Sequence, residues 1–134
     1  LREKMKTMYG ETLSLKQFGV KEPKEHDDFL ARYIEIVKAN ISNPELDVSV
    51  IYEALGMSRT NFYRKVKTVT GLSPIELIKN IRLEAGAKLL KESDMNISEI
   101  AQHIGFSSRS YFARSFKAVY GMSPTEYQET ESQN

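Results

Sequence analysis

Two short stretches of the chain carry side chains suited to a polyanion, and each stretch has the spacing of one helix face. Basic, hydroxyl and amide groups dominate both stretches, and neither contains an acid. Such groups donate hydrogen bonds to phosphate oxygens and to base edges, and an arginine can grip O6 and N7 of a guanine with its two-pronged head. The first set comprises Arg59, Thr60, Asn61, Tyr63, Arg64 and Lys67, and the second comprises Arg109, Ser110, Tyr111, Arg114 and Lys117.

The formal net charge of +1 conceals this local concentration of basic groups. Residues 22–54 hold eight acids against three basic residues, whereas residues 56–71 hold four basic residues and no acid, and residues 105–121 hold three and no acid. An isolated basic stripe is most often a solvated helix face. Two acid-free stripes in matching register favour a polyanionic partner instead.

The other polar residues offer little for catalysis or metal binding. The chain has no cysteine, which excludes disulfides and thiolate metal sites. His26 and His103 are isolated in the sequence, and a surface or packing role suits each better than catalysis. We find no glycine-rich phosphate loop and no cluster of residues with metal-ligand spacing. We therefore expect no enzymatic activity, no cofactor and no metal site.

The elements that must position the two polar sets are helices, because apolar residues recur at helical spacing and no sustained two-residue alternation indicates a strand. A short helix over residues 48–55, capped by Asp47 and ended by Gly56, precedes a second helix over residues 59–70, capped by Ser58. The two form a helix-turn-helix. The apolar face of its second helix contains Phe62, Val66 and Val69.

The same arrangement recurs about fifty residues later. Asn96 and Glu99 have the spacing of a capping box, Gly105 ends the short helix that follows, and Ser108 lies near the start of the next helix. The helices match at an offset of 50 residues but the two glycines match at 49, so the second turn has one extra residue. The matching apolar positions are Phe112, Phe116 and Val119.

Each unit ends in the same seven-residue junction, GLSPIEL at 71–77 and GMSPTEY at 121–127. The glycine suits the left-handed residue that ends a helix, the serine and glutamate have the spacing of a capping box, and the proline suits the first helical position. We therefore expect a tight turn to join each polar helix to a further helix. The flanking apolar pairs, Leu72 with Leu77 and Met122 with Tyr127, fit a hydrophobic staple.

Two longer helices complete a predicted all-α fold of about seven helices. One begins near Asp27, and the other runs from Pro74 to about Lys91, roughly 26 Å at about 1.5 Å per residue. Both show the apolar spacing of a helix buried along one stripe. Gly86 lies inside the second, and since such a glycine costs about 0.5–1 kcal/mol relative to alanine, we expect a soft rod. The stripes comprise Leu30, Ile34, Val37 and Ile41, and Leu77, Ile81, Ala85 and Leu89.

The repeated pattern resembles the DNA-binding domain of AraC/XylS-type transcription regulators. The likeness covers about residues 27–127, through GMSRTNFYRKVKTVTGLSPIELIKNIRLEAGAKLL and ISEIAQHIGFSSRSYFARSFKAVYGMSPTEY. It implies a domain of residues 26–134, with helix-turn-helix lobes at 27–73 and 92–128 joined by a linking helix at 74–91. It also implies sequence-specific binding of double-stranded DNA for transcription regulation, with both recognition helices in successive major grooves, and RNA polymerase as a further partner.

The resemblance also implies roles for individual residues. Lys67 and Lys117 lie where phosphate contact is expected, and Ser58 and Ser108 lie at helix starts, where free amides favour phosphate. The base-reading positions fall on Thr60, Tyr63, Arg64, Arg109, Ser110 and Arg114. The complete set expected at DNA is Ser58, Arg59, Thr60, Asn61, Tyr63, Arg64, Lys67, Ser108, Arg109, Ser110, Tyr111, Arg114 and Lys117.

The first 25 residues differ from the rest of the chain. Leu1, Met5 and Met8 have helical spacing, and the stretch after them shows no lasting period. We interpret residues 1–25 as a linker and the end of an upstream regulatory region. Together with GMSRTNFYRKVKTVTGLSP, the start LREKM and the acidic linker resemble the output end of a hybrid two-component sensor, which implies an upstream receiver domain.

Two further expectations concern the location and the oligomeric state of the chain. No run approaches the roughly 18 apolar residues of a membrane helix, so we expect a cytoplasmic module, which an upstream region could still anchor. We expect the isolated chain to be largely monomeric, with dimerisation upstream raising the local concentration of modules.

A helical adaptor that binds a protein partner is the alternative function, because helix pairs recur in such scaffolds and the first predicted helix is acidic. Two units are fewer than the three or so that repeat stacks need, and the acid-free faces favour DNA.

Overall fold

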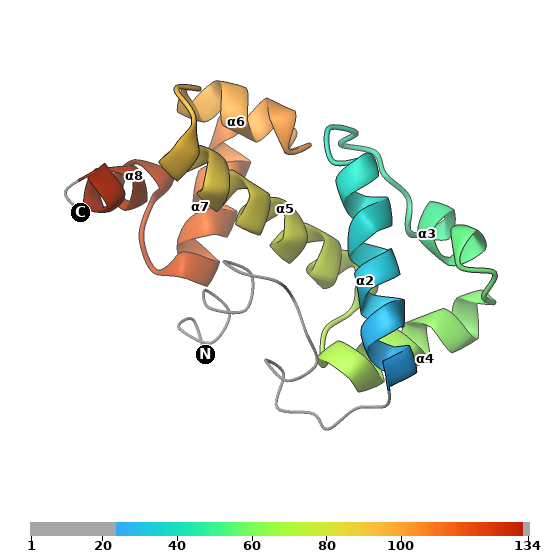
Figure 1. The fold of residues 1–134 in the computed structure, drawn as a ribbon. Coiled ribbons are helices and arrows are strands. Elements are labelled where there is room, and N and C mark those ends of the chain that lie inside the picture. Colours follow the sequence, from blue (N-terminus) through green and yellow to red (C-terminus); the bar gives the residue numbers. More distant parts are fainter. Residues whose placement is uncertain (1–23, 133–134) are drawn as a thin grey trace.

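The computed structural model describes residues 24–132, and within that range its seven helices form two lobes that share one long helix (Figure 1). The prediction of an all-α fold with about seven helices is confirmed. None of the described helices combines the length and the apolar character needed to cross a membrane. The helices are α2 (Lys24–Ala39), α3 (Val48–Ala54), α4 (Arg59–Thr70), α5 (Pro74–Glu92), α6 (Ile97–His103), α7 (Arg109–Tyr120) and α8 (Pro124–Ser132).

The predicted helix ends lie close to the observed ones. The second helix of the first unit spans the expected residues, and α5 extends one residue beyond the predicted end at Lys91. Helix α2 begins three residues before Asp27, inside the stretch interpreted as linker. The Leu1, Met5 and Met8 stripe and the first 23 residues of that linker lie outside the described residues.

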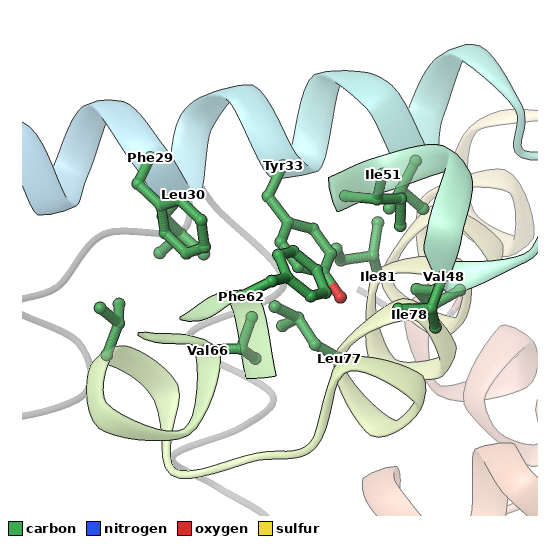
Figure 2. Close-up of a cluster of buried hydrophobic side chains, with 12 residues drawn as sticks. Phe29, Leu30, Tyr33, Val48, Ile51, Phe62, Val66, Leu77, Ile78 and Ile81 are labelled. Carbon is green, nitrogen blue, oxygen red and sulfur yellow. The ribbon is translucent and has the colours of Figure 1, made fainter. Parts of the chain in front are cut away.

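Lobe one packs α2, α3, α4 and the first half of α5 around an aromatic centre (Figure 2). The Tyr33 and Phe62 rings stack with their centroids 5.6 Å apart, and Phe29 meets both rings edge-on. The Tyr33 hydroxyl donates a hydrogen bond to the Pro74 carbonyl oxygen at 2.9 Å. A fully buried tyrosine thus joins α2 to the start of α5 with its polar atom satisfied.

The stripe predicted on α2 is only partly right. Leu30 and Val37 are buried as expected, whereas Ile34 is only partly buried, and Ile41 lies beyond the end of α2 and is also partly buried. Tyr33, which the stripe omits, is fully buried. The predicted stripe used only aliphatic residues, and the buried face of α2 is turned toward its aromatic residues instead.

Lobe two packs α6, α7, α8 and the second half of α5 around a second aromatic cluster. The Phe116 ring stacks on Tyr120 with centroids 4.3 Å apart, and Tyr127 of α8 meets both rings edge-on. Phe112 adds a further edge contact with Phe116. Each lobe therefore has its own core. Helix α4 contributes its apolar face to the core of lobe one, and α7 contributes its apolar face to the core of lobe two.

Helix α5 is buried on several sides, and the prediction of a single buried stripe is wrong. Its first half enters the lobe-one core as far as Ile81, and its second half enters the lobe-two core from Leu83 onward. Polar residues between and beside these, Asn80, Arg82 and Glu84, are buried as well. The helix is thus a shared core element of both lobes, crossing from one to the other in Figure 1.

Gly86 lies where α5 packs closely against lobe two. A Cβ atom at this position would lie 3.0 Å from Cδ1 of Ile104 and 3.1 Å from Cε1 of Phe112. Such spacing is tighter than ordinary van der Waals contact, so the missing side chain lets the helices approach. The structure gives this glycine a packing role, and the softness expected of the rod stays a prediction.

Both seven-residue junctions have the predicted caps. After α4, Gly71 adopts a left-handed φ of 76°, and Ser73 and Glu76 exchange two hydrogen bonds at the start of α5. After α7, Ser123 and Glu126 exchange the same pair of bonds. The capping box predicted before α6 is also present. These caps fix the direction in which the chain leaves each polar helix.

Candidate nucleic-acid interface

Helix α4 presents the first polar set because both its ends and its apolar face are fixed. The Ser58 hydroxyl oxygen accepts a hydrogen bond from the Asn61 amide at 3.3 Å, and the Gly71 amide closes the other end. Phe62, Val66 and Val69 are buried in lobe one. Consequently the opposite face is exposed to solvent, and it carries Arg59, Thr60, Asn61, Arg64 and Lys67.

Helix α7 presents the second set in the same way. The Ser108 hydroxyl oxygen accepts from the Tyr111 amide at 3.0 Å, and Gly121 ends the helix in a left-handed conformation. Phe112 and Phe116 are fully buried, and Val119 is partly buried. The exposed face carries Arg109, Ser110, Arg114 and Lys117.

The two aromatic members of the sets have different surroundings. Tyr63 is half-buried against the lobe-one core, and the Arg59 guanidinium lies 4.7 Å from the centre of its ring. Tyr111 is 39% exposed and rests edge-on against Phe106, with centroids 5.1 Å apart. Tyr63 thus holds a neighbouring arginine in place, whereas Tyr111 offers an accessible ring.

The two lysines at the far ends of the helices also act locally. Lys67 Nζ donates a hydrogen bond to the Gly71 carbonyl oxygen at 3.1 Å, close to the end of α4. This contact satisfies a free carbonyl and suits the negative end of the helix dipole. Lys117 occupies the matching place on α7 and contributes to the lowered pKa of Glu126, after the larger effect of hydrogen bonds from Ser123.

A cleft of ≈ 520 Å³ lies between the two polar helices. Arg59 and Tyr63 of α4 line one side, and Tyr111 of α7 lines the other. Lys79 on α5 lies between them, half-buried, with its ammonium 5.7 Å from the centre of the Tyr111 ring. The cleft therefore connects the exposed faces of both lobes.

Lys79 and Arg82 are the residues of this region that the sequence reasoning missed. Both belong to the linking helix, where a basic residue carries no local signal of its own. Burial lowers the pKa of the Arg82 guanidinium from its ordinary value. Its Nη1 donates to the Gly105 carbonyl oxygen at 2.8 Å and its Nη2 donates to the Asn43 carbonyl oxygen at 2.6 Å. The Gly105 and Asn43 carbonyl oxygens are far from Arg82 in the sequence, and only the packing of the two lobes brings them to it.

A family model described as a helix-turn-helix domain matches residues 51–130, which is more than half of the chain. The match spans both polar helices and the whole of α5 between them. The chain belongs to the AraC-type helix-turn-helix family.

Relatives of this AraC-type chain include two-component proteins. It is 36% identical over 107 residues to histidine kinase P4 of Formosa agariphila, a match that covers 80% of this chain and 8% of that protein. Its fold is similar to that of the C-terminal domain of AraT, a response regulator from Geobacillus stearothermophilus, with a TM-score of 0.67, 31% identity and coverage of 76% and 84%. The chain spans about a third of the length of two curated transcriptional regulators that it also matches.

A second similar structure contains DNA. The DNA-binding domain of AdpA, a global transcriptional factor solved in complex with a target DNA, has a TM-score of 0.68, 25% identity and coverage of 81% of this chain and 93% of that one. The AraC-type chain is therefore a DNA-binding module of a transcription regulator, and the prediction of a binding module that is not an enzyme is confirmed. The roles of individual residues stay predictions.

Proposed function

We propose that this AraC-type domain, residues 26–134, binds double-stranded DNA sequence-specifically by placing α4 and α7 in successive major grooves. The observation that carries the proposal is the matched pair of exposed, acid-free helix faces, each anchored by a serine at its start and a left-handed glycine at its end. Arg64 and Arg114 lie at equivalent positions of the two faces, and both are exposed. Two such faces in one chain can read two neighbouring segments of a duplex.

The exposed side chains divide by their expected contacts. Residues in the first two turns of a recognition helix are suited to base edges, and residues near helix ends are suited to phosphate. For base edges we propose Thr60, Tyr63, Arg64, Arg109, Ser110 and Arg114. For phosphate we propose Ser58, Lys67, Ser108 and Lys117, with Arg59, Asn61 and Tyr111 completing the interface.

We propose a binding site of two unlike half-sites about 10 bp apart on one face of the DNA. The polar sets are similar but not identical, so each lobe should prefer its own sequence. Helix α5 has 19 residues and is about 28 Å long at about 1.5 Å per residue, whereas successive major grooves lie about 34 Å apart. If the lobes cannot span that distance, the DNA should bend toward the protein.

In the full-length protein we propose an upstream receiver or sensor region, joined through residues 1–25, and RNA polymerase as a further partner. The two-component relatives support the first of these. We place the domain in the cytoplasm, where DNA and polymerase are found, and expect the isolated chain to be largely monomeric. A tight dimer of this chain in analytical sedimentation would contradict that expectation.

Selection of binding sites from random duplexes, followed by titration at several salt concentrations, tests the proposed function. We expect a non-palindromic site, and an affinity that falls steeply as salt rises because phosphate contacts release counterions. A palindrome bound by a dimer with one lobe on each half would contradict the arrangement. Affinity for DNA that does not depend on salt or sequence would favour the alternative, a helical adaptor for a protein partner.

A further inference from the structure

The two lobes are joined at a second place besides the continuous helix α5. The segment that follows α2, residues 41–43, lies against residues 103–105, which are the end of α6 and the start of the turn after it. The Ser42 hydroxyl donates a hydrogen bond to the His103 carbonyl oxygen at 2.7 Å. Arg82 donates one bond to each side, to Asn43 and to Gly105. We call this set of contacts the interlobe joint.

The joint is tightly packed at Gly105. This glycine has a left-handed φ of 86°, and a Cβ atom there would clash with the Ile41 carbonyl oxygen and lie 2.8 Å from Nη1 of Arg82. The turn of lobe two therefore has no room for a side chain where it meets lobe one. The nearest atom, the Ile41 carbonyl oxygen, belongs to the backbone, which yields less easily than a flexible side chain.

Burying Arg82 at this position is energetically unfavourable. It is 8% exposed, both its acceptors are backbone carbonyl oxygens, and its Nε has no hydrogen-bond partner among the described residues. Desolvating a cation without full compensation lowers stability, and an apolar side chain of similar size often replaces a buried charge at little cost. Stability alone therefore does not explain the residue.

The location of Arg82 on α5 gives a better explanation. Ile81 belongs to the core of lobe one and Leu83 to the core of lobe two, so the arginine lies at the boundary between two separate cores. Without the joint, the middle of one helix would connect the lobes, and long helices bend. A planar guanidinium that donates to both sides opposes that bending, because its donors are fixed in direction.

We propose that Arg82 is a positioning residue, which fixes the distance and angle between α4 and α7 and thereby selects the spacing between the two half-sites. This inference rests on the proposed function, that both helices bind DNA together. Changing the spacing by one base pair moves the second groove by about 3.4 Å and turns it by roughly 35° around the DNA axis. A stiff joint cannot follow that movement, so the DNA must deform instead.

A distance measurement without DNA tests the joint itself. The chain has no cysteine, so Thr68→Cys and Ala118→Cys, at exposed and equivalent positions of α4 and α7, accept two spin labels without competing sites. We expect pulsed dipolar spectroscopy to give one narrow distance distribution for the parent chain and a broader one for Arg82→Met. Arg32→Met is the matched control, because it makes the same exchange at an exposed position of α2 away from the joint, and it should leave the distribution narrow.

Ser42→Ala keeps the test decisive if Arg82→Met fails to fold. Ser42 is exposed, and this change removes one hydrogen bond from the joint while Arg82 remains. We expect a smaller broadening of the same distribution. Unchanged distributions in all folded joint variants would overturn the inference, and would leave the proposed DNA binding intact.

Binding to duplexes with altered half-site spacing tests the consequence. We expect the parent chain to bind on the order of tenfold more weakly when one base pair is added or removed, and the joint variants to lose most of that preference. Their affinity for an isolated half-site should be unchanged, which a merely destabilised protein would not show. A broadened distance distribution with an unchanged spacing preference would overturn the inference. A parent chain that ignores spacing would instead overturn the proposed use of both grooves.

Discussion

The turns of the two helix-turn-helix units have the same backbone conformation in different surroundings. Gly56 has a φ of 68° and Gly105 has a φ of 86°, so both need the left-handed region that glycine tolerates. A Cβ atom at Gly56 would meet nothing within 4 Å, whereas one at Gly105 would clash with lobe one. The first turn is a local feature of its lobe, and the second is also the surface on which the lobes meet.

The two turns differ by one residue, as the sequence predicts. Helices α3 and α6 match at an offset of 49 residues, and α4 and α7 match at 50, so the extra residue falls between the helices of the second unit. Phe106 in this longer turn is buried against Phe112, whereas Met57 in the first turn is only partly buried. The longer turn therefore adds an aromatic ring to the core of lobe two.

Substituting the two turn glycines should give the largest difference between the lobes. Gly56→Ala should lower the free energy of unfolding by about 1–2 kcal/mol, the cost of a left-handed alanine. Gly105→Ala should lower it by about 2–5 kcal/mol, because overpacking against Ile41 adds about 1–3 kcal/mol. Urea unfolding of both variants measures the difference. Equal losses of unfolding free energy in the two variants would mean that the interlobe joint shifts easily to make room for the added methyl group.

Removing one arginine from each polar face should show whether the lobes read DNA separately. Arg64→Ala and Arg114→Ala should each cost about 1–3 kcal/mol of binding free energy on the selected site and much less on random DNA. Each should relax sequence preference only in its own half-site, with little change in folding. Affinity measured on the selected and a scrambled duplex over a salt series tests this.

The lysines provide the controls for that measurement. Lys117→Ala should weaken binding to all sequences alike and reduce the salt slope by about one. Lys67→Ala should do the same, but it also removes the hydrogen bond to Gly71 and should lower stability slightly. If the arginine variants behave like the lysine variants, the arginines are phosphate contacts. Base reading would then fall to Thr60, Tyr63, Arg109 and Ser110.

Gly86→Ala separates a packing role for this glycine from a soft linking helix. Alanine should gain about 0.5–1 kcal/mol of helix stability and lose about 1–3 kcal/mol through contact with Ile104 and Phe112. The expected net result is a loss of about 1 kcal/mol in the free energy of unfolding. A more stable variant with a narrower distance distribution between α4 and α7 would support softness instead.

The smallest expected effects concern pH and the two junction caps. Hydrogen bonds from Ser73 lower the pKa of Glu76 below its ordinary value of 4.5, and hydrogen bonds from Ser123 do the same for the pKa of Glu126. Each carboxylate therefore stabilises the folded chain above pH 4.5, and this contribution is lost as the pH falls through the lower pKa of the folded state. Glu76→Gln and Glu126→Gln should each reduce the acid sensitivity of unfolding.

The pKa of Glu84 is shifted in the opposite direction from the pKa values of Glu76 and Glu126. Burial raises the pKa of this carboxyl group, so its contribution to stability is present below the ordinary value and is lost as the pH rises through the higher pKa. Glu84→Gln should therefore raise the free energy of unfolding more at neutral pH than at acid pH, where the carboxyl group of the parent chain is already protonated. Denaturant unfolding of all three glutamine variants over the same pH series measures both effects. A loss of stability at neutral pH would show that the Glu84 carboxylate has compensating partners.

Local signals predicted the helices and the two polar faces. The caps at Ser58, Ser73 and Asn96 lie where the sequence places them, because each cap involves backbone groups only two or three residues away. The exposed faces of α4 and α7 follow from the same reasoning, since apolar residues three or four positions apart must turn toward a core. The sequence alone also indicated the family, through motifs that belong to single helices and single turns.

Only the tertiary structure decided how the two units are joined. Tyr33, Arg82 and Gly105 acquire their roles from atoms 23 or more residues away in the chain, such as the Pro74, Asn43 and Ile41 carbonyl oxygens. Periodicity shows which side of α5 is apolar, but a helix that enters two cores has two apolar sides and a polar boundary between them. The relative placement of the recognition helices therefore depends on contacts between distant segments, and no local pattern of residues encodes that distance.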